Sequence, residues 1–172
     1  MSGASRPSRW AARLLTWTSQ WGLGWHALTV VLIARPGAAR RVGAAGTTAW
    51  LVAQAVTAVL KPLVGRQRPP LPGTGPGVSS SSMPSTHTAS AAAYATAALL
   101  QHRAGTALLV PAAGVAWSRI RTRRHFVTDV AVGLVAGCAI GVAVGTAMRR
   151  LRSDDADRTE RGRKRHGVEA SG

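Results

Sequence analysis

The sequence predicts an all-α, polytopic membrane helix bundle of about five transmembrane helices, with polar residues gathered at one membrane face. Five stretches of apolar and small polar residues contain no Lys, Arg, Asp or Glu: residues 14–34, 42–60, 85–102, 104–118 and 130–148. Most of them approach the roughly 17–25 residues that cross a bilayer core of about 30 Å. Charges and prolines gather between these stretches, and no extended strand-type alternation is present. The repetition of the pattern along the chain carries the prediction.

The 172 residues have the length of one domain, which we expect to be membrane-embedded over residues 1–148. A net charge of +16 would suit a nucleic-acid partner, but the charges fall in clusters between long uncharged blocks. We therefore expect this chain to be embedded in a membrane bilayer and to bind no nucleic acid. Residues 149–172 are polar, mixed in charge and glycine-containing, and are predicted to form a disordered tail.

The predicted helices follow in order. The first, 14–34, is longer than the apolar core of a signal peptide, so we expect an uncleaved span. After the second helix, residues 61–84 form a long loop with six prolines. A helix at 85–102 and a shorter one at 104–118 precede the last span, 130–148.

Glycines recur at every fourth position of this last span: Gly133, Gly137, Gly141 and Gly145. Such a face permits the close approach of a neighbouring helix. We expect that helix to belong to the same chain, with a homo-oligomer formed through this face as the alternative.

Three polar clusters lie at the junctions between spans, at residues 61–69, 84–87 and 118–129. The chain returns to the same side of the membrane after the second and after the fourth span. Crossing parity therefore places all three clusters at one membrane face, whatever the orientation of the protein.

The clusters contain the residue types that bind and transfer phosphate. Lys61, Arg68 and Arg119 supply cations, and a helix start at 85–87 supplies backbone N–H groups. Residues 1–148 hold fourteen Lys and Arg but a single carboxylate, Asp129, four residues after His125. A carboxylate at that spacing can fix the tautomer of the imidazole by a hydrogen bond.

This arrangement predicts phosphoryl transfer through a phosphohistidine on His125, with Asp129 as its orienting partner. No cluster of Cys and His or of several carboxylates is present to hold a metal, so we expect neither metal nor cofactor.

The same residues carry a resemblance to a known family. Lys61 to Pro69 fits K-x6-R-P, Ser118 to Asp129 fits S-R-x5-H-x3-D, and 84–87 reads P-S-T-H where P-S-G-H is usual. In this order the motifs resemble those of the type 2 phosphatidic acid phosphatase and vanadium haloperoxidase superfamily. The resemblance covers residues 61–129. The membrane branch commonly has six spans, one more than we predict.

The resemblance implies a role for each matched residue. Lys61, Arg68 and Arg119 would bind the phosphate, together with Ser85 and the backbone amide of Thr86. His125 would be the nucleophile, Asp129 its orienter, and His87 the acid that protonates the leaving oxygen. Thr86 replaces the usual glycine; its N–H is retained, but its side chain needs room.

We therefore expect a membrane lipid phosphatase acting on a phosphomonoester or pyrophosphate. The resemblance implies phosphatidic acid, phosphatidylglycerol phosphate, a polyprenyl diphosphate or a polyprenyl-linked sugar phosphate. A non-catalytic protein that binds anionic lipid and a haloperoxidase on the same phosphate pocket remain alternatives. We expect the inner membrane of a bacterium. Once the three predicted phosphate-binding cations are set aside, the basic residues near the spans balance across the membrane. Those of the distal tail favour a cytoplasmic tail with the site facing outward.

Overall fold

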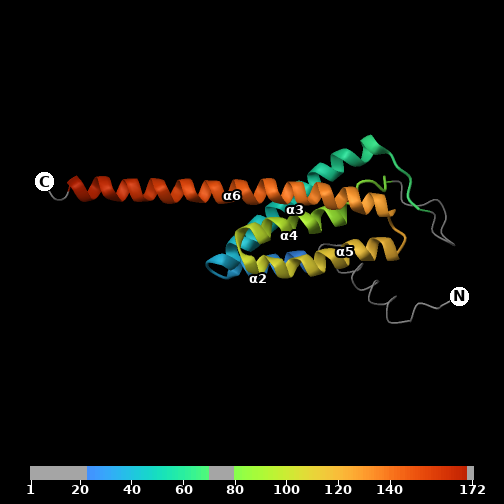
Figure 1. The fold of residues 1–172 in the computed structure, drawn as a ribbon, viewed down its shortest axis with the longest axis horizontal. Coiled ribbons are helices and arrows are strands. Elements are labelled where there is room, and N and C mark those ends of the chain that lie inside the picture. Colours follow the sequence, from blue (N-terminus) through green and yellow to red (C-terminus); the bar gives the residue numbers. More distant parts are fainter. Residues whose placement is uncertain (1–22, 70–79, 170–172) are drawn as a thin grey trace.

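The computed structural model describes residues 23–69 and 80–169, with side chains described up to Arg163. All regular structure in this part of the chain is helical (Figure 1). The helices are α2 (Leu23–Ala34), α3 (Ala38–Val64), α4 (Thr86–Gln101), the short 3-10 helix η1 (Arg103–Leu108), α5 (Leu109–Arg121) and α6 (Val127–Glu169). The predicted all-α class is confirmed. Residues 14–22 of the first predicted span lie outside the described residues.

Each predicted span corresponds to one helical segment, with η1 and α5 together replacing the span at 104–118. Two segments are long and apolar enough to cross a bilayer, α3 and the Val127–Arg163 part of α6. The other helices are shorter. The molecule is thus a helix bundle of the membrane type, and α3 and α6 are its two long apolar members.

Helix α4 lies at the centre of the bundle, where α3, α5 and α6 all contact it. Its sequence, T-H-T-A-S-A-A-A-Y-A-T-A-A-L-L-Q, is rich in alanine, and most of its residues are buried. Because α4 faces protein rather than lipid, small side chains serve it better than large apolar ones. Tyr94 is the large exception: it fills the space left by Gly46 of α3, and its hydroxyl lies 3.2 Å from that of Thr29.

The four glycines of α6 pack against α4. A Cβ at Gly133 would lie 2.7 Å from the carbonyl oxygen of Ser85, and one at Gly137 would overlap the carbonyl oxygen of Ala89. Gly141 and Gly145 meet the following turns of α4 in the same way. The expectation of an internal neighbour is therefore correct. Helix α4 covers the four glycines, and a homo-oligomer stays a prediction.

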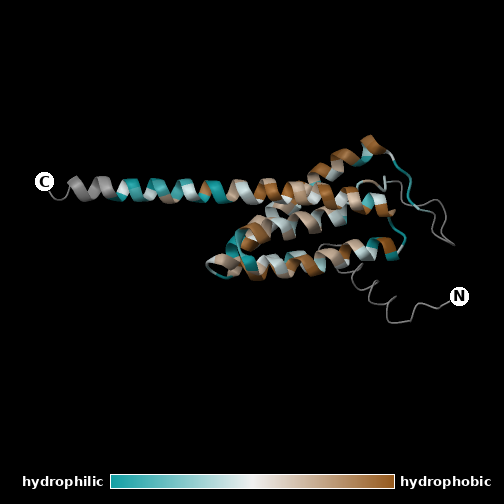
Figure 2. Ribbon diagram, viewed as in Figure 1, coloured by the Kyte–Doolittle hydropathy of each residue, from teal (hydrophilic) through white to brown (hydrophobic). Residues whose placement is uncertain are grey.

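Helix α6 does not end with its apolar part. Beyond Met148 it continues without interruption to Glu169 and projects away from the other helices (Figures 1 and 2). The disordered tail predicted from residue 149 is therefore wrong for the described residues. Arg, Ala, Lys and Glu are good helix formers, no proline intervenes, and Asp157 accepts a 2.9 Å hydrogen bond from Arg161 one turn later.

Candidate active site

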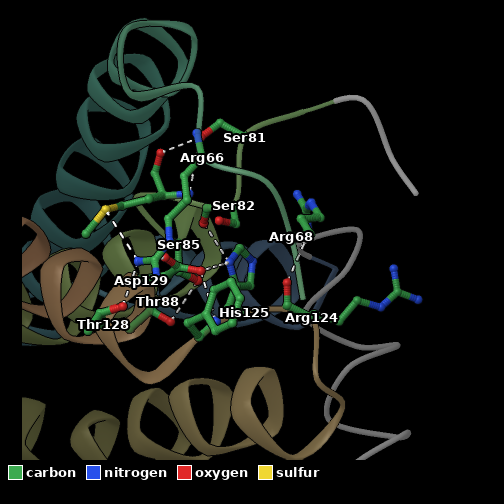
Figure 3. Close-up of polar contacts among 12 residues, drawn as sticks. Arg66, Arg68, Ser81, Ser82, Ser85, Thr88, Arg124, His125, Thr128 and Asp129 are labelled. Carbon is green, nitrogen blue, oxygen red and sulfur yellow. Dashed lines mark hydrogen bonds and ion pairs between the residues drawn. The ribbon is translucent and has the colours of Figure 1, made fainter. Parts of the chain in front are cut away.

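The three predicted polar clusters meet at one end of the bundle. The first spans the C-terminus of α3, which ends at Val64 and so includes Lys61, the second begins α4, and the third joins α5 to α6. Figure 3 shows residues from all three around His125. The convergence expected from crossing parity is confirmed in the structure.

A short pairing of two extended segments builds one wall of this site. Helix α3 ends at Gly65, whose positive φ of 61° lets its N–H bond the carbonyl of Lys61. The chain then runs past residues 80–82. The N–H of Ser82 donates to the carbonyl of Arg66 at 2.8 Å, and the Ser82 hydroxyl donates to the carbonyl of Gln67 at 3.0 Å.

This pairing fixes the imidazole of His125. The ring is buried, and its Nδ1 lies 2.7 Å from the backbone carbonyl oxygen of Ser82 (Figure 3). A carbonyl oxygen can only accept a hydrogen bond, so Nδ1 must carry the proton. In a neutral imidazole the other nitrogen, Nε2, then holds a free lone pair.

The surroundings of His125 favour that neutral form. The pKa of its imidazole is lowered from 6.5 to about 4, mainly by burial and then by the positive charges of Arg68 and Lys61. The Ser82 hydrogen bond and the charge of Asp129 act in the opposite direction and are outweighed. The ring is therefore uncharged at neutral pH, with its proton on Nδ1, which is the state that a nucleophile requires.

Asp129 is fully buried, and two donors bind its carboxylate. Oδ1 accepts a 2.9 Å hydrogen bond from the Arg66 guanidinium, and Oδ2 accepts one of 2.9 Å from the backbone N–H of Phe126. Phe126 directly precedes α6, so Asp129 satisfies an N–H at the start of the helix, as the third residue of a capping box does. Oδ2 lies 3.7 Å from Nδ1 of His125, too far for a hydrogen bond. The predicted hydrogen bond between them is therefore wrong, because Ser82 already binds that nitrogen.

Two residues with clear structural roles escaped the sequence analysis. Arg66 binds Asp129, donates a 2.7 Å hydrogen bond to the Thr128 hydroxyl and stacks 4.5 Å from the centre of the Phe126 ring. A buried carboxylate needs a cationic partner, and that rule could have pointed to Arg66. Ser82 is fully buried and acts partly through its backbone carbonyl, which no residue type reveals.

The three predicted phosphate-binding cations lie close to one another. Arg119 is 3% exposed, Lys61 is partly buried, and each lies near enough to Arg68 for their charges to interact. Arg68 donates to the carbonyl and hydroxyl oxygens of Ser80, at 3.2 and 3.1 Å. Burial lowers the pKa of Arg68, and the nearby charge of Arg124 lowers it further. Concentrated positive charge of this kind suits an anionic ligand.

The start of α4 carries three of the predicted site residues, Ser85, Thr86 and His87. Ser85 is fully buried, its hydroxyl lies 3.1 Å from that of Thr88, and its N–H donates to the carbonyl of Asp129. Its hydroxyl thus contacts the first turn of α4, and its binding of phosphate stays a prediction. Thr86 and His87 begin the helix and are partly exposed, and the Ser85 hydroxyl does not cap their N–H groups. Those N–H groups remain suited to an anion.

No group of three or more His, Cys, Asp or Glu residues that could hold a metal ion occurs among the described residues. The site as described consists of the buried imidazole of His125, the buried carboxylate of Asp129, which is hydrogen-bonded to Arg66, and a set of cations. These are the groups that phosphate binding and attack by an imidazole nitrogen require.

The fold and this site define the class of protein. The family model described as the PAP2 superfamily matches residues 44–153, more than half of the chain. The chain belongs to the PAP2 superfamily, and the resemblance carried by the three motifs is confirmed. It is a membrane phosphatase by class.

Individual relatives agree with this assignment. The chain is 37% identical over 148 residues to decaprenylphosphoryl-5-phosphoribose phosphatase of Mycobacterium tuberculosis, with 82% of each chain covered, and the strains CDC 1551 and H37Rv give the same values. The fold is similar to the crystal structure of a transmembrane PAP2-type phosphatidylglycerolphosphate phosphatase from Bacillus subtilis. That match has a TM-score of 0.65 and 24% sequence identity, and it covers 86% of this chain and 80% of the other.

Proposed function

We propose that this protein hydrolyses a phosphomonoester or pyrophosphate on a lipid through a phosphohistidine formed at Nε2 of His125. The observation that carries the proposal is the 2.7 Å contact between Nδ1 of His125 and the carbonyl of Ser82. It leaves the lone pair of Nε2 available, and the pKa of about 4 keeps the ring neutral. A binding protein for anionic lipid would need the cations but no buried, neutral imidazole among them.

In the first step, Nε2 attacks phosphorus and the bond from phosphorus to the leaving oxygen breaks. His87, at the start of α4, gives a proton to that oxygen. In the second step, a water molecule attacks phosphorus and gives one of its protons to the now neutral His87. The nitrogen–phosphorus bond breaks, and inorganic phosphate leaves. Lys61, Arg68, Arg119 and the N–H groups of Thr86 and His87 bind the phosphoryl oxygens through both steps.

The reaction proceeds in this proposal without a metal ion. Cations of the chain replace Mg²⁺ in balancing the charge of the transferring group. The charges of Arg68 and Lys61 act on His125, and Arg119 lies near enough to Arg68 for their charges to interact. Activity should therefore survive EDTA, and vanadate should inhibit as a five-coordinate mimic of the transition state.

The substrate that we infer from the comparison with relatives is a polyprenyl lipid bearing a sugar phosphate. Support comes from the 37% identity to a phosphatase named for decaprenylphosphoryl-5-phosphoribose. We further propose that the site faces outward from the inner membrane of a bacterium. Figure 1 shows the start of α6, where the site lies, and the polar far end of this helix at its two opposite ends. In this proposal these two ends lie on opposite sides of the membrane, with the basic tail in the cytoplasm. A cysteine at Ser80, in a Cys138→Ala background, should then react with an impermeant thiol reagent in intact cells.

The decisive experiment traps the intermediate. Purified protein is mixed with a ³²P-labelled lipid phosphate, quenched in alkali within milliseconds and analysed for acid-labile phosphohistidine, with and without EDTA. We expect label on the wild type and none on His125→Gln. Turnover without a labelled intermediate would contradict the phosphohistidine. Turnover that requires a divalent ion would contradict metal independence.

A further inference from the structure

The site holds more positive charge than one bound phosphate group would neutralise. Within residues 1–148 the single carboxylate is Asp129, and Arg66 is hydrogen-bonded to it. Three predicted phosphate-binding cations remain, and a fourth, Arg124, lies among them. A phosphomonoester carries about 1.5 to 2 negative charges at neutral pH. Roughly two positive charges at the site therefore stay unbalanced when one phosphomonoester is bound.

The backbone places Arg124 between two of the motif arginines. Its N–H donates to the carbonyl of Arg119 at 3.1 Å, and its own carbonyl lies 3.5 Å from the guanidinium of Arg68. The preceding residue, Arg123, has a positive φ of 52° and reverses the chain after α5. Arg124 is partly buried and directly precedes the nucleophile His125. Figure 3 shows the side chains of Arg68 and Arg124 extending to the same side of the site.

A cation in this place can reach an anion near the reacting phosphate. Consecutive Cα atoms are about 3.8 Å apart, and the arginine side chain extends farther than that. The Arg124 guanidinium is thus within reach of a substrate group that lies a few bonds from the phosphorus attacked by His125 in the proposed function. Its guanidinium fork suits a phosphodiester or a second phosphate.

We propose that Arg124 binds a second anionic group of the substrate, so that the site selects lipids carrying a phosphodiester or second phosphate beside the phosphomonoester it hydrolyses. This proposal rests on the proposed function, because it concerns the same site. The neighbouring Arg121 makes a useful contrast: it is exposed, and its guanidinium lies 6.0 Å from the centre of the Trp117 ring.

The test compares two substrates that differ in the second anion. Phosphatidylglycerol phosphate carries a phosphodiester beside its phosphomonoester, whereas phosphatidic acid with the same acyl chains lacks it. The kcat/KM ratio for the pair is measured in neutral detergent micelles for the wild type, Arg124→Gln and the matched control Arg121→Gln. A charge-assisted hydrogen bond corresponds to a factor of roughly 10 to 100. We expect Arg124→Gln to lower the ratio by that factor through KM, and Arg121→Gln to leave it unchanged.

The remaining outcomes separate the possible failures. An unchanged ratio in an active Arg124→Gln variant would overturn the role of Arg124 and leave the phosphatase function intact. A wild type inactive on every lipid phosphate would overturn the proposed function itself. Anionic phosphatidylglycerol is added in a final arm. If it stimulates the wild type equally on both substrates and Arg124→Gln removes only that stimulation, Arg124 binds a neighbouring lipid, and the proposal is wrong.

Discussion

The two hydrogen bonds at the Asp129 carboxylate make Asp129→Asn an informative substitution. Asparagine has the same shape but one acceptor oxygen, so either the Arg66 guanidinium or the Phe126 N–H must then face an NH₂ group. An unsatisfied buried group costs about 1–3 kcal/mol, and a hydrogen bond to a charged group contributes about 1.5–3 kcal/mol. The Arg66 side chain is 36% exposed, and water offsets part of the loss. We expect the free energy of unfolding to fall by about 2–3 kcal/mol.

The catalytic rate of Asp129→Asn should fall by less than the family motif would suggest. His125 keeps the Ser82 carbonyl as its partner in this variant, so its tautomer should persist. We expect kcat on p-nitrophenyl phosphate to fall by less than about 100-fold. Where a carboxylate itself fixes the tautomer, the amide costs about 10⁴-fold. Unfolding in detergent and steady-state rates are measured together, with the exposed Asp157→Asn as control. A 10⁴-fold loss at unchanged stability would show that Asp129, not Ser82, holds the imidazole.

Three further predictions concern other parts of the structure. His87→Ala should slow hydrolysis of a lipid phosphate by roughly 10²–10⁴-fold but spare hydrolysis of p-nitrophenyl phosphate, whose leaving group needs little protonation. His125→Ala should abolish hydrolysis of both substrates. If His87→Ala slows the two reactions by the same factor, its role as the acid is contradicted. Because the pKa of His125 is about 4 when folded and 6.5 when unfolded, the unfolded state takes up the proton first, and stability should fall as pH drops from 6.5 to 4. An unfolding series against pH should show this slope in the wild type and a smaller one in His125→Asn. Gly137→Val should destabilise the folded protein by about 1–3 kcal/mol, because a Cβ at this position overlaps the backbone of Ala89. Gly162→Ala should not destabilise it, because the space around Gly162 is open. Equal thermal unfolding midpoints for the two variants would refute this explanation of the packing.

The sequence allowed the architecture and the location of the site to be predicted for a physical reason. Uncharged runs of span length and the parity of crossings depend on residue type and order alone. The same holds for the cations and for His125, whose motif spacing is fixed along the chain. These predictions needed no knowledge of side-chain geometry.

The hydrogen bonds at the site could not be predicted in that way. The contact of His125 with Ser82 depends on the path of the loop backbone, and the four consecutive serines at 79–82 do not reveal which carbonyl points inward. Spacing placed Asp129 near His125 correctly but could not show that Arg66 and Phe126 occupy its oxygens. The polar, mixed-charge composition after residue 148 predicts disorder, but the same residues favour a helix, and α6 is therefore longer than the sequence predicts.

The uninterrupted course of α6 also constrains how the two ends of the molecule can communicate. Its 43 residues correspond to about 65 Å at 1.5 Å per residue, roughly twice the thickness of the bilayer core. A straight rod of that length keeps its far end from reaching back to its own active site. A force applied to the polar half would instead tilt or turn the rod as a lever. At the opposite end it would move the first turn of the helix, where Asp129 joins α6 to Arg66.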